Sequence, residues 1–194
     1  MWKTAELRWW WDAKSIPALE KWLLRDVTPL RDNRTDLYLA DPEMTDASVK
    51  RRAREEVDVK VLTGLPDISL PPHMQGQAEQ WVKVGARRIP LTDENTVAVG
   101  KKRRRRILGF EDGGWVEAAS EDDVESGVAL ELSDVECGGE HWTTVCFEAF
   151  GADDARLAAM LQAALTLLGP WPDDVPEPEI SGGYPFWLGQ RAKG

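Results

Sequence analysis

Residues Thr96 to Leu108 read TVAVGKKRRRRIL, a strand-like opening that runs directly into six consecutive basic residues, Lys101 to Arg106. Because successive side chains of a strand point to opposite faces, this run cannot form one basic patch and should place three cations on each face. Three cations buried in an apolar core would be very unfavourable. The stretch therefore predicts that one face of its strand lines a wet, charged cavity.

The composition limits the kind of protein to which such a cavity belongs. The chain has 194 residues, of which 42% are hydrophobic and 30% charged, as in a globular protein of one domain or one domain with an appendage. A net charge of −10 argues against a general nucleic-acid binder. No signal-like or long apolar segment is seen, so we expect a cytoplasmic protein that does not enter a membrane.

Cysteine and histidine offer little metal chemistry. The chain has only Cys137, Cys146, His73 and His141, without a C-x-x-C motif, so we do not expect a zinc site. The two cysteines flank a Gly138-Gly139 turn, which leaves a cross-strand disulfide open. Two free thiols is the preferred interpretation for a cytosolic protein.

Alternation of apolar and charged residues recurs along most of the chain. It predicts strands at residues 4–11, 33–40, 47–54, 56–63, 77–84, 96–108, 127–136 and 141–150. A short helix is expected at 16–25, and Asp153 should cap a longer amphipathic helix that ends at Leu168. The acidic stretch 109–127 is expected to be a loop with a helical turn.

These eight strands keep apolar residues on one face and charges of both signs on the other. An α+β fold would satisfy this pattern, with an antiparallel eight-stranded β-barrel that has a polar bore and an apolar outer face covered by flanking helices. We predict a barrel domain at residues 1–168, including its C-terminal helix. Residues 169–194 should form a Pro-rich extended tail whose aromatic side chains pack on the barrel. The alternatives are that they cover a second copy of the chain in a homodimer or that they cover the mouth of the bore.

The order of the segments resembles the CYTH domain of the triphosphate tunnel metalloenzyme superfamily, over residues 4–168. The resemblance rests on the order of its parts, which begins with a charged first strand and a helix. The segments that come next are, in chain order, TDLYLA (35–40), SVKRRA (48–53), EVDVKVL (56–62), EQWVKV (79–84), VGKKRRRR (99–106), ALELSDV (129–135) and TVCFEAFG (144–151). It implies a tunnel in which cations hold a triphosphate-containing small molecule and glutamates hold a divalent metal.

Basic residues on several strands are the expected phosphate ligands. They are Arg8, Lys50, Arg52, Lys60, Lys83, Lys101, Lys102, Arg103 and Arg104. If Val97 and Val99 face outward, ideal alternation sends Lys102, Arg104 and Arg106 into the bore. A bulge that shifts the register would instead send Lys101 and Arg103 inward, and the sequence leaves both registers open.

The resemblance also implies a site for Mg²⁺ or Mn²⁺, held by Glu6, Glu131 and Glu148, with Glu131 and Glu148 as catalytic residues. The first strand departs from the E-x-E-x-K pattern of the family, because Arg8 and Trp10 stand at its second and third positions. Three functions therefore stay open. The leading expectation is a protein that binds a triphosphate-bearing anion and hydrolyses an inorganic or organic triphosphate in a metal-dependent reaction. The alternatives are binding of a polyphosphate or nucleotide without catalysis, and a structural interaction module.

Overall fold

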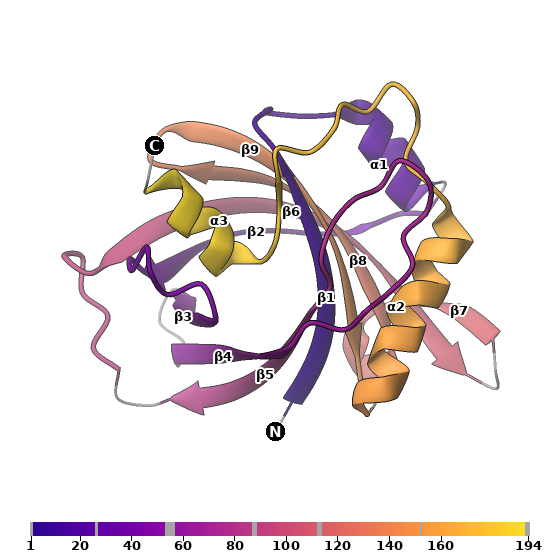
Figure 1. Ribbon diagram of the computed structural model, residues 1–194, viewed down its shortest axis with the longest axis horizontal. Coiled ribbons are helices and arrows are strands. Elements are labelled where there is room, and N and C mark those ends of the chain that lie inside the picture. The colour runs from indigo at the N-terminus through magenta and orange to yellow at the C-terminus, as the bar shows by residue number, and fades with distance from the viewer. Residues whose placement is uncertain are drawn as a thin grey trace.

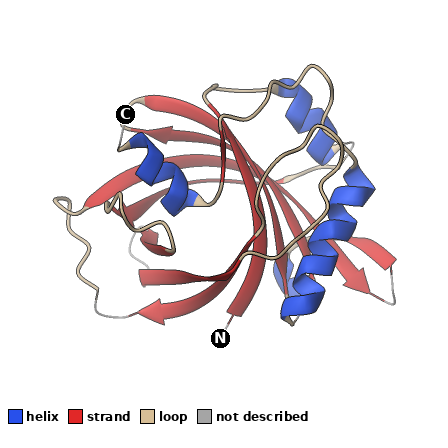
Figure 2. Ribbon diagram, viewed as in Figure 1, coloured by secondary structure: helices blue, strands red, loops and turns tan. Residues whose placement is uncertain are grey.

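A computed structural model of the chain describes residues 2–25, 27–52, 57–86, 89–111, 114–151 and 153–192. Eight antiparallel strands close into a barrel (Figures 1 and 2). Around the ring they follow the order β1 (Trp2–Trp11), β5 (Glu79–Ala86), β4 (Val57–Gly64), β3 (Ala47–Arg52), β2 (Leu30–Leu39), β6 (Thr96–Glu111), β8 (Gly127–Cys137) and β9 (Glu140–Phe150). Pairing of β9 with β1, from Thr4 opposite Phe150 to Trp11 opposite Thr143, closes the ring. The predicted α+β barrel is therefore confirmed.

Several elements lie outside the ring. They are α1 (Pro17–Leu24), β7 (Gly114–Ala118), the 3-10 turn η1 (Glu121–Asp123), α2 (Asp154–Leu168), β10 (Ile180–Ser181) and α3 (Tyr184–Arg191). The prediction of a loop over the whole of 109–127 is wrong at its start, because β6 continues to Glu111 and pairs with β7. Phe110 and Trp115 hold this hairpin in an edge-to-face contact with ring centroids 5.2 Å apart. Residues 53, 54 and 56 of the predicted strands lie outside the described part of the chain.

The outer face of β1, β8 and β9 carries the main apolar core, which α1 and α2 cover (Figure 1). Leu7 and Trp9 of β1 and Phe147 of β9 are fully buried against Leu161 of α2. The side chain of Asp153 accepts a hydrogen bond from the Arg156 N–H and caps α2, as the sequence predicts. Burial of this apolar area stabilises the packing of α1 and α2 on the barrel by about 25 cal/mol per Å².

The tail is not extended throughout, because residues 184–191 form α3, which lies inside the curve of the sheet while α1 and α2 lie outside it (Figure 1). Trp187 of α3 stacks in parallel on Trp10, with ring centroids 4.2 Å apart, and both are fully buried. Tyr38 and Val99 belong to the same cluster. An apolar layer that includes α3 therefore fills one end of the bore.

Cys137 and Cys146 are both free and buried, which confirms the preferred interpretation. Cys146 lies in the bore, where its register partner on β8 is Glu131. Cys137 accepts a hydrogen bond from Arg191 of α3, with 2.7 Å between Nη1 and Sγ. Within the described ranges, no helix combines the length and the apolar character that crossing a bilayer would require.

Candidate anion-binding cavity

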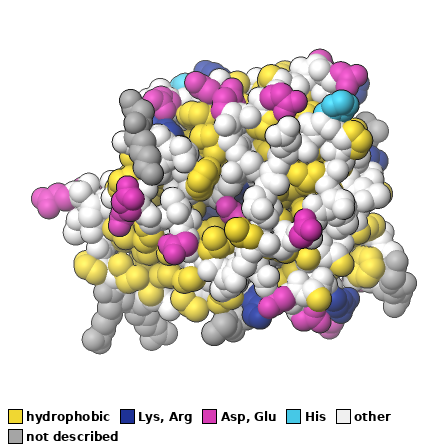
Figure 3. All heavy atoms as spheres, in the orientation of Figure 1, with side chains coloured by type: hydrophobic (Ala, Val, Ile, Leu, Met, Phe, Trp, Pro, Cys, Tyr) yellow, Lys and Arg dark blue, Asp and Glu magenta, His cyan; other side chains and the backbone are white. Residues whose placement is uncertain are grey.

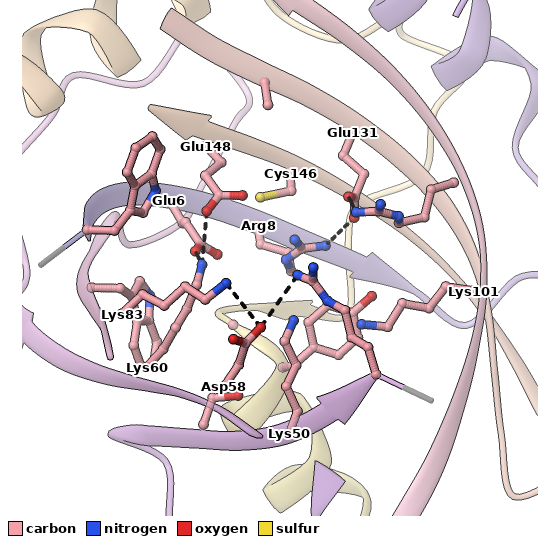
Figure 4. A pocket seen from close by; sticks show the side chains of 18 of the residues that line it. Glu6, Arg8, Lys50, Asp58, Lys60, Lys83, Lys101, Glu131, Cys146 and Glu148 are labelled. Atoms are coloured by element: carbon pink, nitrogen blue, oxygen red, sulfur yellow. Dashed lines mark hydrogen bonds and ion pairs between the residues drawn. The ribbon is translucent and has the colours of Figure 1, made fainter. Parts of the chain in front are cut away.

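The bore next to the α3 layer holds a cavity of about 680 Å³ (Figure 4). Among the described residues, nine cationic side chains and six carboxylates line it. The cations are Arg8, Arg34, Lys50, Arg52, Lys60, Lys83, Lys101, Arg103 and Arg105, and the carboxylates are Glu6, Asp58, Glu121, Asp122, Glu131 and Glu148. In a chain with a net charge of −10, this excess of cations is local, and the face shown in Figure 3 carries scattered acidic but few basic side chains.

The odd-numbered members of the basic run line the cavity. Side-chain exposure rises along β6 from 2% at Lys101 to 10% at Arg103 and 24% at Arg105. No bulge is needed for this register, because Val97 and Val99 also face inward, against the α3 layer. The cavity is thus deepest at Lys101 and opens toward Arg105.

The even-numbered members lie on the outer face of β6, so the prediction that Lys102 and Arg104 bind the ligand is not supported. Lys102 is exposed, and Arg104 contacts Glu20 of α1 at 2.9 Å and Asp134 of β8 at 2.8 Å. Arg106 pairs with Glu117. The prediction depends on Val97 and Val99 facing outward, a condition that fails because α3 supplies an apolar partner inside the barrel.

At the deep end one carboxylate faces three cations. Asp36 is fully buried, and its carboxylate oxygens lie 2.8 Å from Lys101 Nζ, 3.2 Å from Arg34 Nε and 3.7 Å from Lys50 Nζ. Burial lowers the pKa of Lys50 to about 8, and the nearby cations Arg52, Lys60 and Arg34 lower it further. The carboxylate of Asp36 raises this pKa but does not compensate for them. Burial and Lys50 likewise lower the pKa of Lys101. Three cations thus converge on Asp36, and one of them, Arg34, also lies 4.0 Å from Asp32.

A second cluster surrounds Glu131. Its carboxylate accepts hydrogen bonds from Arg8 at 3.4 Å, Arg103 at 3.0 Å and the Ser133 hydroxyl at 3.0 Å. Burial acts to raise the pKa of Glu131, but the attraction of Arg8 and Arg103 outweighs it and lowers that pKa well below the ordinary value. Glu131 is therefore an ionised partner of two arginines.

A third cluster joins Lys60 to two carboxylates. Its Nζ atom donates to Glu6 and, at 2.9 Å, to Glu148 (Figure 4). Although burial opposes it, the attraction of Glu148 and Glu6 raises the pKa of Lys60, while Lys60 lowers that of Glu148. Closer to the mouth, Asp58 lies 3.1 Å from Lys83 and 3.8 Å from Arg52. Figure 4 shows these groups converging on the cavity from several strands.

The carboxylates expected to hold Mg²⁺ or Mn²⁺ are engaged in ion pairs in this arrangement. Glu6 and Glu148 face an ammonium group, and Glu131 faces two guanidinium groups. The described residues contain no cluster of three or more His, Cys, Asp or Glu side chains placed to share a metal ion. The donor set is therefore used in ion pairs within the cavity.

The fold brings together all the expected site residues except Lys102 and Arg104. Sequence reasoning did not single out Arg34, Arg105, Tyr38 or Tyr184. The alternation of Arg34, Asp36 and Tyr38 along β2 indicates that these side chains share one face of the strand, so it could have identified Arg34 and Tyr38. Tyr184 belongs to the aromatic tail that the sequence predicts to pack on the barrel, but only the folded chain places it inside the bore.

Several donors on the wall of the cavity lack a protein partner. The buried Nε atoms of Arg8, Arg52 and Arg105 make no hydrogen bond to the described protein, and neither does the hydroxyl of Tyr184. Buried polar groups are almost always hydrogen-bonded in folded proteins. The wall of the site therefore combines an excess of cationic side chains with buried donors that have no partner among the described residues.

Comparison with known proteins adds no family to this description. No protein-family model matches the chain, and none of the curated proteins is significantly similar to it in sequence.

Proposed function

We propose that this protein binds a triphosphate-bearing small molecule in the cavity of its barrel, without hydrolysing it. The observation that carries the proposal is the excess of cations in the cavity, where nine of the described basic side chains and six carboxylates form the wall and Lys101, Arg34 and Lys50 converge on the buried Asp36. An anion with several charges would balance them. Lysine and arginine bind phosphoryl oxygens through charge-assisted hydrogen bonds, which in a poorly solvated site are among the strongest polar contacts.

The shape of the cavity supports a ligand that enters phosphate end first. Cations line its wall from the mouth, at Arg52 and Lys83, to the deep end, at Lys101. Alternate residues of a strand are about 7 Å apart, so Lys101, Arg103 and Arg105 span roughly 14 Å. A chain of three phosphoryl groups fits within that length. The resemblance to the CYTH domain supports the same class of ligand.

Metal-dependent hydrolysis is the second candidate. It is favoured by the convergence of Glu6 and Glu148 on one point, the Nζ atom of Lys60, and by the family-like order of the strands. Binding without hydrolysis ranks first because both carboxylates are already paired with that lysine.

Calorimetric titration with inorganic tripolyphosphate in EDTA tests the proposal. Arg105 and Arg106 form a matched pair, since each contacts one glutamate, Glu121 or Glu117, but only Arg105 lines the cavity. We expect Arg105→Gln to weaken binding about tenfold, the effect of one hydrogen bond to a charged group, and Arg106→Gln to leave it unchanged. No binding by the wild-type protein would overturn the proposal and favour an interaction module.

Phosphate release in the presence of Mg²⁺ or Mn²⁺ separates the two candidates. We expect release at the rate of a blank without protein. Metal-dependent release that a Glu148→Gln variant loses would establish hydrolysis instead.

A further inference from the structure

Tyr184 is the first residue of α3 and lies between two cations of the cavity. Its ring centroid is 3.6 Å from Lys101 Nζ and 4.8 Å from Arg8 Cζ. It also stacks on Tyr38, with ring centroids 5.2 Å apart, and meets Trp10 edge to face at 4.8 Å. These contacts fix the ring at the deep end of the bore.

The two stacked tyrosines differ in their hydroxyl groups. That of Tyr38 accepts a hydrogen bond from Lys101 at 2.7 Å. The hydroxyl of Tyr184 is buried and has no hydrogen-bond partner among the described residues. The side chain lines the cavity, and only 9% of the residue is exposed. A buried hydroxyl without a hydrogen bond is unfavourable, and an anion in the adjoining cavity would supply the missing acceptor.

The start of α3 is anchored from two strands. Glu79 of β5 accepts hydrogen bonds from the Gly183 N–H at 3.0 and 3.2 Å, and Trp10 Nε1 of β1 donates to the Gly182 carbonyl at 2.8 Å. Gly182 has a φ of 146°, in the region that favours glycine, and an added Cβ there would lie 2.8 Å from Phe186. The Tyr184 hydroxyl is thus held in place before any ligand binds.

We infer that the hydroxyl of Tyr184 donates a hydrogen bond to the innermost phosphoryl group of the bound anion, so that α3 supplies part of the binding site. This inference rests on the proposed function and adds to it a neutral donor among the cations. Burial raises the pKa of Tyr184 well above its ordinary value, so the hydroxyl keeps its proton at neutral pH. The ligand would be recognised by a terminal phosphoryl group as well as by its total charge.

The test is titration of Tyr184→Phe with inorganic tripolyphosphate in EDTA, beside thermal unfolding of the free protein. The substitution removes one oxygen and keeps the ring between Lys101 and Arg8. We expect affinity to fall roughly tenfold or more, because the hydrogen bond has a charged acceptor. The melting temperature of the free variant should be unchanged or higher, since the lost hydroxyl has no partner to leave behind.

Tyr38→Phe is the comparison variant. Its hydroxyl already holds Lys101, so we expect this substitution to lower the melting temperature of the free protein, which Tyr184→Phe does not. Equal affinities of wild type and Tyr184→Phe would overturn the inference and leave the proposed function standing. Absence of any binding by wild type would overturn both. A lower melting temperature for Tyr184→Phe would assign the hydroxyl a structural role and also overturn the inference.

Discussion

The amino group of Lys60 lies 2.9 Å from Oε1 of Glu148, one of the three glutamates that the sequence predicts as metal ligands. The same nitrogen donates to Glu6, so one lysine on β4 bridges carboxylates from β1 and β9, on either side of the barrel seam. A positive charge is thus supplied by the chain itself. The bridge ties three strands together, and Lys60 lowers the pKa of Glu148.

Loss of this bridge should destabilise the protein. Lys60→Ala leaves Glu6, which is 7% exposed, as an uncompensated carboxylate, whereas Glu148 is partly open to solvent. We expect the free energy of unfolding at pH 7 to fall by about 2–3 kcal/mol, as measured by urea denaturation. Addition of Glu6→Gln to Lys60→Ala should restore part of the loss. A double variant less stable than Lys60→Ala would show that the carboxylate is not the source.

The response to divalent cations should depend on Lys60. In the wild-type protein, Mg²⁺ or Mn²⁺ must compete with the ammonium group for Glu6 and Glu148, so we expect little change in melting temperature. In Lys60→Ala the two carboxylates are released and offer hard oxygen ligands, and Mn²⁺ should raise the melting temperature. Addition of Glu148→Gln to this variant is the control and should remove the rise. A large Mn²⁺ effect on wild type would contradict the expectation.

Binding of polyphosphate should depend on pH through Lys50. Its pKa of about 8 in the folded protein lies below the ordinary 10.5, and a nearby anion would raise it. Binding at pH 8–9 should therefore take up protons, and affinity should decline as the pH rises through that range. Calorimetry in two buffers with different ionisation enthalpies measures the uptake. Lys50→Gln should reduce the uptake and leave the part that comes from Lys101, and a wild-type protein that takes up none would refute the assignment.

The same shift predicts how Lys50 affects stability. Between pH 8 and 10.5 the unfolded chain binds a proton at this lysine that the folded protein lacks, so this group makes the free energy of unfolding rise with pH. Below pH 8 the buried charge is unfavourable. Lys50→Met should then stabilise the protein at pH 7 by about 1–2 kcal/mol, with a gain that fades toward pH 10.5. Urea denaturation at both pH values checks this, and a variant destabilised at pH 7 would contradict it.

The α3 layer should contribute strongly to stability. Trp187→Ala removes a fully buried ring that stacks on Trp10 at 4.2 Å, and we expect a loss of about 3–5 kcal/mol. Trp2→Ala removes a ring that is 48% exposed, and its effect should be below about 1.5 kcal/mol. Thermal and urea unfolding of the two variants measure the contrast. Equal losses would mean that α3 is only loosely attached to the barrel.

The sequence by itself determined the barrel and most of its cavity. Period-two alternation, as in Val57, Asp58, Val59 and Lys60, depends only on the geometry of one strand, so it can be read locally. A helix such as α2 can likewise be predicted locally, from its N-cap at Asp153 and its apolar stripe. Once eight such strands close a ring with the charges inward, the polar bore follows.

Only the tertiary structure decided the register of the basic run and the use of the carboxylates. Alternation states that Lys101 and Lys102 face opposite ways, but not which of them faces in. That depends on α3, whose Trp187 gives Trp10 and Val99 an apolar partner inside the barrel and so turns Lys101 inward. Likewise, Lys60 and Glu148 are far apart in the chain, and their pairing follows from closure of the ring. Contacts of this kind have no local pattern, because they arise between segments that only the folded chain brings together.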